Sequence, residues 1–363
     1  MRISFLGDIM TGDHQVSFSK DLEAHLAQSD IVIGNLEGPI TAARPRQDKR
    51  RPLHMDPEVG FFSKPYHLNA VILANNHIMD HGIDGLVNTQ LYLDHLSISY
   101  VGAGINIHEA AKPLILKAEG ASICVVAFSH NEGPMATKDT PGPCPLFAYE
   151  ILFNYLNELK KENDFLVLSY HGGEEFFTVP WVRRQKLFEI FVQAGVDIVF
   201  GHHAHAVQGY KKLGCSAIIY GAGNFYMNTP HQLSNPGTEL GAIFDVEYTA
   251  LKSELNIYYI PTYANHLSKR VVMASGHQKE KVEHIITMSR KCLTDPELHS
   301  KEWNRQSFKR FKGRYRWVGI VYRLCRFCWT KRELFKRDAD LTEKRDRDIA
   351  VGAIQHIFSK IYR

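Results

Sequence analysis

The first 265 residues alternate short apolar, β-branched runs with longer stretches of helical periodicity, and this alternation constrains the fold more than any other feature. Helical periodicity is clearest in residues 148–161 and 182–194, and Gly195 supplies a stop for the second helix. The candidate strands are residues 3–6, 31–33, 71–73, 123–128, 165–169, 198–200 and 218–220. This order of elements is typical of an α/β protein.

The later part of the chain has a different pattern. Residues 243–248 and 255–260 alternate apolar and polar positions, which predicts antiparallel edge strands of a second sheet. Beyond about residue 277 the strand pattern stops and a charged helical pattern follows. We therefore expect a folded domain over residues 1–265 and a basic helical extension over residues 266–363.

Positive charge is concentrated in that extension. Residues 301–337 hold thirteen Lys and Arg against two Glu, a net charge of +11. Because the whole chain has a formal charge of +4, the remainder carries −7. Cations alternate with aromatic residues over 308–329. This pattern is compatible with packing on the protein itself, or with docking of 303–337 on an anionic membrane surface or an acidic partner. Binding to nucleic acid is the weakest of the three interpretations.

The thiols and the N-terminus indicate a reducing, cytoplasmic setting. The six cysteines are scattered, which favours reduced thiols, and the C-x-x-C at Cys325 and Cys328 has no second pair to complete a zinc site. Asp8 interrupts the first apolar run too early for a signal peptide. No stretch approaches the ~18 uncharged apolar residues of a membrane-spanning helix. We expect a cytoplasmic protein that docks, if at all, on the inner face of the membrane.

Side chains that bind metals follow five of the predicted strands. Carboxyl ends of strands are where open α/β sheets place their functional sites. The five segments are Gly7-Asp8, Gly34-Asn35-Leu36-Glu37, Ala74-Asn75-Asn76-His77, His171-Gly172-Gly173-Glu174-Glu175 and Gly201-His202-His203-Ala204-His205. Taken singly, each residue is more often a turn, capping or buried structural residue. Taken together, they predict a metal centre.

A mixed set of carboxylate, amide and imidazole ligands suits a pair of divalent ions such as Mn, Zn, Fe or Mg. Glu37 is the candidate bridging ligand between the two ions. Asp8 and His205 would hold one ion, and Asn76, His171 and His203 the other. His203 and His205 are two residues apart, so in a loop they can point toward different ions.

The motifs resemble those of the CapA-type proteins of poly-gamma-glutamate and capsule synthesis, whose fold is similar to the calcineurin-like metallophosphatases. The matching segments span residues 1–265 and include Gly7-Asp8-Ile9-Met10, Asn75-Asn76-His77, His171-x-Gly173-x-Glu175, His203-x-His205-x-x-Gln208 and Gly223-Asn224-Phe225. The resemblance implies a four-layer αββα sandwich and the ligand set above. It also implies a catalytic role for His77, near substrate oxygens, and for Glu175, as a base or orienting residue. Met10 stands where the phosphatases have a histidine, so the first ion has fewer ligands.

These features predict a metal-dependent hydrolase that cleaves a phosphoester or amide in a polymeric or lipid-linked anionic substrate during capsule, exopolysaccharide or poly-gamma-glutamate synthesis. The tail is expected to contact anionic membrane or capsule-synthesis proteins. Two alternatives stay open. The chain could be a non-catalytic assembly component with a vestigial metal site, or a module that binds polyanions through cations that include the basic loop at residues 44–51.

Overall fold

A computed structural model describes residues 1–59, 67–130, 132–249 and 254–314. The chain divides into two compact units, Met1–Thr287 and Met288–Arg363. Every strand found among the described residues belongs to the first unit. The division expected at residue 265 stays a prediction about domain organisation. Most of the segment 303–337 lies outside the described residues.

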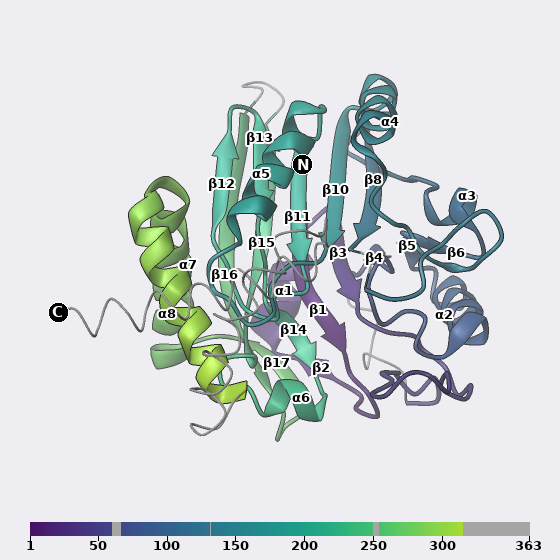
Figure 1. Cartoon of the computed structure of the whole chain (residues 1–363), viewed down its shortest axis with the longest axis horizontal. Helices are drawn as coiled ribbons and strands as arrows, with labels where there is room; N and C mark the ends of the chain where they lie inside the picture. The colour runs from purple at the N-terminus through teal and green to yellow at the C-terminus, as the bar shows by residue number, and fades with distance from the viewer. Residues whose placement is uncertain (60–66, 131, 250–253, 315–363) are drawn as a thin grey trace, which may run out of the picture. The chain divides into compact units, whose positions relative to one another are not determined.

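The first sheet has nine strands and is built around β1, Arg2–Met10 (Figure 1). One flank of β1 carries β3, β4 and β5, which all run parallel to it: Ile31–Leu36, Ala70–Ile72 and Ser99–Val101. The other flank carries β14 beside the end of β1, and then the series β15, β16, β17 and β2: Asn224–Met227, Leu240–Thr249, Glu254–Asn265, Arg270–Met273 and Ser17–Phe18.

The expectation that residues 243–248 and 255–260 form edge strands of a second sheet is wrong. Both belong to the first sheet, and β15 lies between β1 and β16, so it has a partner on each side. The alternation of apolar and polar residues reports how the two faces of a strand are covered and carries no information about its neighbours.

The second sheet has six strands in the order β12-β13-β11-β10-β8-β7. Its central strands β8, β10, β11 and β13 are parallel, as expected for buried, β-branched runs. The bounds are Tyr210–Leu213, Ser216–Ile219, Ile198–His202, Phe165–His171, Ala121–Ser129 and Leu114–Ala118. A separate pair, β6 with β9, joins Ala103–Gly104 to Gly142–Pro143.

The two sheets pack face to face. Alternate side chains of both sheets form one buried core, in which the rings of Phe5 and Phe200 have centroids 5.0 Å apart. The outer face of the first sheet is covered by α1 and α2, Lys20–Leu26 and Gly82–His95, through buried residues such as Leu22 and Leu86. Sandwich cores of this kind bury aliphatic side chains that each stabilise the fold by ~1.5–3 kcal/mol.

The outer face of the second sheet is covered by α4 and α5, Tyr149–Glu162 and Val182–Gln193. Phe188 of α5 packs on Tyr170 of β10 and stacks on Tyr220 after β13. The order helix, sheet, sheet, helix confirms the expected four-layer αββα sandwich. The short helices α3 and α6 are Ile107–Ala110 and Pro230–Leu233.

Two longer helices follow the last strand: α7, Gly276–Thr294, and α8, Pro296–Arg314. Both lie within residues 266–363, and the expectation that this range forms a basic helical extension stays a prediction. No helix within the described ranges combines the length and the apolar composition that a bilayer span requires.

Candidate metal centre

Two groups of buried side chains meet where strands of both sheets end. One group consists of Asp8, Glu37 and His205, and the other of Glu37, His171 and His203. Within each group the candidate ligand atoms lie within 4.8 Å of one another. Glu37 belongs to both groups, which is the position expected for a ligand shared by two ions. Five of the six residues proposed from the sequence as ligands are therefore brought together in these groups.

The strand directions account for this convergence. Asp8 lies near the end of β1, Glu37 follows β3 directly, His171 is the last residue of β10, and His203 and His205 follow β11. These four strands run parallel within their own sheets, so their carboxyl ends gather at one edge. Because the sheets pack face to face, the two edges together enclose the centre.

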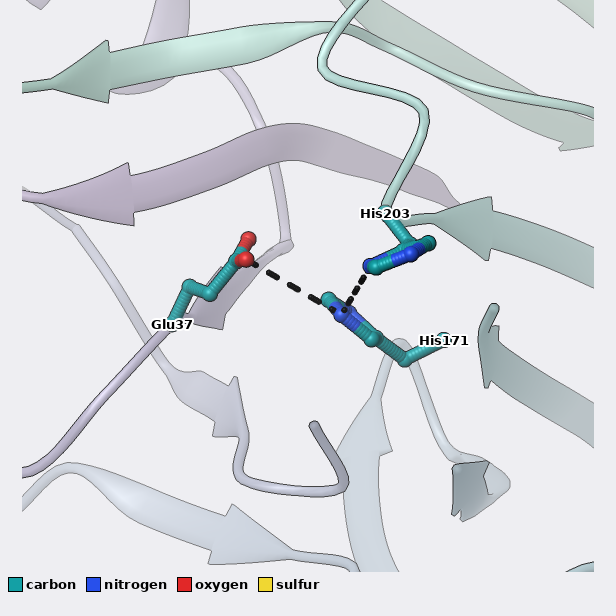
Figure 2. Close-up of side chains that lie close together, drawn as sticks. All are labelled: Glu37, His171 and His203. Atoms are coloured by element: carbon teal, nitrogen blue, oxygen red, sulfur yellow. Dashed lines mark hydrogen bonds and ion pairs between the residues drawn. The ribbon is translucent and has the colours of Figure 1, made fainter. Parts of the chain in front are cut away.

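Glu37, His171 and His203 approach one another across the sandwich (Figure 2). His171 Nε2 lies 3.9 Å from Glu37 Oε1 and 3.1 Å from His203 Nδ1. Asn76, the sixth predicted ligand, joins this group through its side-chain oxygen, which lies 3.0 Å from His171 Nε2. The imidazole nitrogens and amide oxygen thus face a common point.

The other group is organised by Asp8. Its carboxylate contacts His205 Nδ1 at 3.1 Å and His202 Nδ1 at 3.0 Å, and His205 Nε2 lies 3.4 Å from Glu37 Oε1. Met10, which stands where the phosphatases have a histidine, is buried in the apolar core between the first sheet and its helices. This group therefore offers three ligand side chains, with His202 beside them.

The loop between His203 and His205 has an unusual backbone. Both histidines have positive φ values, 80° and 49°, a region that costs a non-glycine residue about 1–2 kcal/mol. Phe176 donates its backbone N–H to the carbonyl of Ala204 and so holds the loop from outside. The strained turn directs two imidazoles at different groups, the arrangement predicted from their spacing. Strain of this kind is concentrated at functional sites.

Glycine lets another part of the chain approach Asp8. A Cβ on Gly7 would lie 2.0 Å from the carbonyl oxygen of Gly223, so only glycine allows β14 to come this close to β1. Asn224 then lies opposite Asp8 in the sheet, and its side-chain oxygen lies 2.9 Å from His205 Nδ1. Such contacts fix the orientation of a ligand imidazole.

The electrostatics of the centre follow from its burial. For Asp8, burial would raise the pKa, but hydrogen bonds from His202 and His205 hold it well below its usual range. Burial raises the pKa of Glu37 well above its usual range, and the Asp8 and Glu175 carboxylates act in the same direction. Burial, helped by His203, lowers the pKa of His171 well below its usual range.

The pKa of His205 shifts in the opposite direction to that of His171. Burial would lower its pKa, but the carboxylate of Glu37 and the hydrogen bond to Asp8 raise it to about 10. This raised pKa means that the His205 imidazole carries a proton at neutral pH. Divalent ions displace such protons when they bind.

The residues fit a divalent cation. Neither carboxylate oxygen of the fully buried Glu37 has a hydrogen-bond partner among the described residues. A buried carboxylate without hydrogen bonds is costly, and a divalent ion would offset this cost. Carboxylate, amide and imidazole donors also match the chemistry of Mn, Zn or Fe ions. The fold therefore provides candidate sites for divalent metals.

Three residues beside the centre were not singled out as site residues from the sequence. Asn35 donates its side-chain N–H to Asp8 Oδ1 at 2.8 Å, His202 contacts the same oxygen, and Glu132 Oε2 lies 3.5 Å from His203 Nε2. Asn35 and His202 stand within motifs that were recognised, so their positions in those motifs were the available signal. Glu132 lies in a loop after β8, and nothing in its local sequence marks it.

The two residues expected to be catalytic lie at the border of the centre. His77 Nδ1 lies 2.7 Å from Asp80 Oδ2, and His77 follows the ligand candidate Asn76 directly. Glu175 is partly exposed and near enough to raise the pKa of both Glu37 and His205. The structure places both beside the candidate ligands, and their catalytic roles stay predictions.

The candidate ligands lie in a part of the chain that is similar to known proteins. The sequence profile of the family described as bacterial capsule synthesis protein PGA_cap matches residues 2–229, which include every ligand candidate. The PGA biosynthesis protein CapA of Bacillus subtilis is 30% identical over 236 residues, covering 61% of this chain and 62% of that protein. The capsule biosynthesis protein CapA of Bacillus anthracis is 29% identical over 248 residues, covering 62% and 59%.

The chain thus matches about three fifths of the length of these relatives. Among solved structures, a putative 5'-nucleotidase from Staphylococcus aureus aligns with a TM-score of 0.45 at 15% identity, covering 78% of this chain and 58% of that one.

Proposed function

The chain belongs to the bacterial capsule synthesis protein PGA_cap family, and from this premise we propose that it is a metal-dependent hydrolase acting on an anionic polymer or lipid-linked intermediate of capsule or poly-gamma-glutamate synthesis. The bond cleaved would be a phosphoester or an amide. The observation that carries the proposal is that Glu37 is shared by two buried groups of ligand type.

Each residue has a distinct part in the proposal. Asp8, Glu37 and His205 would hold one divalent ion, and Glu37, Asn76, His171 and His203 the other. When bound, such ions supply electrophilic activation of the scissile group and of an attacking water. Asn35, His202 and Asn224 orient these ligands through hydrogen bonds to Asp8 and His205.

His77 is placed to act on the leaving group. Asp80 accepts from His77 Nδ1, which leaves Nε2 as the atom that can hold a proton for a departing oxygen or nitrogen. Glu175, partly exposed at the border of the centre, is the candidate to accept a proton from an incoming water. Both assignments depend on the substrate entering from their side.

The experiment combines metal content with turnover. Protein purified without chelator is analysed for metal, and hydrolysis of bis(p-nitrophenyl) phosphate and shortening of poly-γ-glutamate are measured with added Mn²⁺. His203→Ala should lose hydrolysis by at least about a hundredfold, as expected for loss of a metal ligand or its ion. His108→Ala, an exposed histidine on α3, is the matched control. Equal rates for the wild type and His203→Ala would contradict catalysis at this centre.

A second candidate function is a non-catalytic assembly component of a polymer synthesis machinery. The observation in its favour is that Met10 is buried in the core where the phosphatases have a ligand histidine. In that case the ligand substitutions would reduce thermal stability and leave no hydrolysis of either substrate to lose.

We also propose that the basic segment 303–337 docks the protein on an anionic membrane surface or on capsule-synthesis proteins at the cytoplasmic face. Its net positive charge supports this proposal, at ~1 kcal/mol per cation near an anionic surface. Sedimentation with anionic vesicles should be lost when 303–337 is deleted. Equal sedimentation of the full and shortened chains would remove the proposal.

A further inference from the structure

A basic loop is held beside the candidate metal centre. The loop spans residues 41–55, and its two ends are joined by backbone hydrogen bonds from Thr41 N to Met55 O at 3.0 Å and from Met55 N to Pro39 O at 2.8 Å. Between these ends the chain carries five cations within eight residues: Arg44, Arg46, Lys49, Arg50 and Arg51. Asp48 is the one acidic residue among residues 41–55.

Asp80 attaches this loop to the site. Its buried carboxylate lies 2.5 Å from Lys49 Nζ and accepts the backbone N–H of Leu53 at 2.8 Å. The carbonyl of Asp80 accepts the backbone N–H of Arg46 at 2.9 Å. The same carboxylate contacts His77, the candidate acid, at 2.7 Å. One buried residue therefore positions both the loop and His77.

The distance from the loop to the centre is short. Lys49 Nζ donates to the backbone carbonyl of Asn76 at 3.3 Å, and the Asn76 side-chain oxygen lies 3.0 Å from His171 Nε2. One contact therefore joins a loop cation to the candidate metal ligand Asn76, and a second contact leads on to His171. Lys49 thus brings the loop within reach of a ligand bound at the centre.

Three of the cations are available for a ligand. Arg46 pairs with Asp48, and Lys49 pairs with Asp80. Arg44, Arg50 and Arg51 are exposed, and none of them has an acidic partner within the described part of the chain. Clustered unpaired cations repel one another, so an arrangement like this favours a multivalent anion.

The amino-acid composition of the loop indicates which kind of anion it can bind. Arginine forks bind carboxylates and phosphates in a bidentate manner. Residues 41–55 contain no Phe, Tyr or Trp, the rings on which successive nucleic-acid bases most often stack, and His54 is the one aromatic side chain in this range. The loop also has no large exposed apolar side chain of the kind that enters a membrane. A flexible chain bearing regularly repeated carboxylates fits these properties.

We infer that Arg44, Arg50 and Arg51 form a binding subsite for a carboxylate-bearing polymer chain, next to the candidate metal centre. The inference rests on the proposed function for the nature of the polymer, and it deepens that function by assigning where the chain outside the scissile bond is held. Lys49 and Asp80 fix the subsite relative to His77 and Asn76, so they are positioning residues.

The test measures binding without turnover. Fluorescein-labelled poly-γ-glutamate of defined length is titrated with the full-length protein in chelator, and fluorescence anisotropy gives Kd. The variant Arg44→Ala/Arg50→Ala/Arg51→Ala should bind about tenfold or more weakly, and its binding should depend less steeply on salt. The control Lys112→Ala/Lys117→Ala/Lys186→Ala removes the same charge from exposed positions elsewhere and should change Kd less than about twofold.

Several results would overturn the subsite. They are absence of wild-type binding, equal weakening by both triple variants, and unchanged binding of the loop variant. Tighter binding of polyphosphate that the loop variant loses would also overturn the assignment to carboxylate. A loop variant that fails to fold is replaced by Arg50→Glu, a single exposed substitution with the same expected direction. Because binding is measured without metal, it stands apart from hydrolysis. Turnover without loop-dependent binding would refute the subsite alone, and binding without turnover would refute the hydrolase alone.

Discussion

His202 Nδ1 lies 3.0 Å from Asp8 Oδ1, and the two residues come from different sheets of the sandwich. His202 ends β11 in the second sheet, and Asp8 belongs to β1 in the first. Both side chains are almost fully buried. This contact therefore joins the two sheets at the candidate metal centre, and the stability of the fold and the state of the centre depend on each other.

Glu37→Gln should separate the effect of the buried carboxylate on the stability of the metal-free fold from its role in metal binding. Burial together with Asp8 and Glu175 raises the pKa of Glu37, so at neutral pH its carboxylate destabilises the metal-free fold. The neutral amide should therefore stabilise protein held in chelator by about 1–3 kcal/mol, measured by chemical denaturation. The same variant should lose both ions in elemental analysis of protein purified without chelator.

The control for that experiment is Glu150→Gln, an exposed glutamate on α4. It removes the same charge and should leave both stability and metal content within experimental error. A Glu37→Gln protein that is less stable than the wild type in chelator would show that the carboxylate is already satisfied within the fold.

Binding of a divalent ion should release protons and strengthen with pH. Burial raises the pKa of Glu37, and the pKa of His205 is raised to about 10, so protons on these two side chains compete with a metal ion. Affinity for Mn²⁺ should therefore rise by about tenfold per pH unit for each proton displaced. Calorimetric titration in two buffers of different ionisation enthalpy counts the protons, and a count of zero would contradict this account.

Asp245→Asn should destabilise the fold most at neutral pH. Asp245 is buried in the first sheet and contacts Arg2 at 2.6 Å, His25 at 2.9 Å and Ser4 at 2.5 Å. Burial would raise its pKa, but the hydrogen bonds from His25 and Ser4 lower it below the usual 3.8. Because the folded-state pKa is depressed, the stabilisation is complete above the unfolded-state pKa and is lost as pH falls through the folded-state value.

Denaturant unfolding at several pH values measures this effect. The free energy of unfolding should fall by about 3–5 kcal/mol at neutral pH, since breaking a buried ion pair leaves Arg2 without its carboxylate partner. The difference from the wild type should shrink below about pH 4. Asp139→Asn, at an exposed loop position, is the control and should have little effect. A difference that stays constant over this range would exclude the carboxylate charge as its cause.

Arg184→Leu tests whether the loop after β10 depends on a buried cation. Arg184 is 3% exposed and donates to the carbonyls of Gly172 and Tyr220 at 2.9 and 3.1 Å and to the side chain of Gln208. Gly172 follows His171, so loss of the guanidinium should weaken metal binding by about 10–100-fold as well as stability by about 3–5 kcal/mol.

The neighbouring Arg183→Leu is the matched control for that substitution. Arg183 is exposed, and its guanidinium lies 5.1 Å from the Trp181 ring, so its loss should cost no more than about 1 kcal/mol. Metal affinity is measured by competition with a chromogenic chelator. Equal effects of the two variants on metal affinity would show that Arg184 does not position His171.

Local sequence was sufficient to predict the parallel strands and the residues that most of them bring to the candidate centre. Residues 31–33 and 198–200 are continuous β-branched or aromatic runs, buried on both faces, and one glycine separates each run from the polar residues that follow. Each strand runs parallel to its neighbours within its own sheet, and functional side chains gather at the carboxyl ends of such strands, so convergence of Glu37 and His203 was predictable. The partners of residues 243–248 were not predictable, because strand pairing depends on contacts distant in sequence.

The contacts that orient the candidate ligands could not be predicted from local sequence either. Arg184 lies in an amphipathic helix where an arginine is ordinarily solvent-exposed, and only the tertiary fold buries it. His202 belongs to the segment His202-His203-Ala204-His205. The alternation of side chains along a strand does not by itself show which of these imidazoles faces Asp8. Glu132 comes from a loop whose path depends on the packing of the second sheet.

The candidate ligands are assembled from segments nearly two hundred residues apart, from Asp8 near the start to His205 after β11. During synthesis on the ribosome, the early segments leave the exit tunnel long before the histidine loop exists. Neither group of side chains can therefore chelate an ion as described until β11 has been made and the two sheets have docked. Acquisition of metal would then mark the completion of the sandwich in the living cell, and a chain cut short before residue 203 should neither capture the ions nor gain their protection against proteolysis.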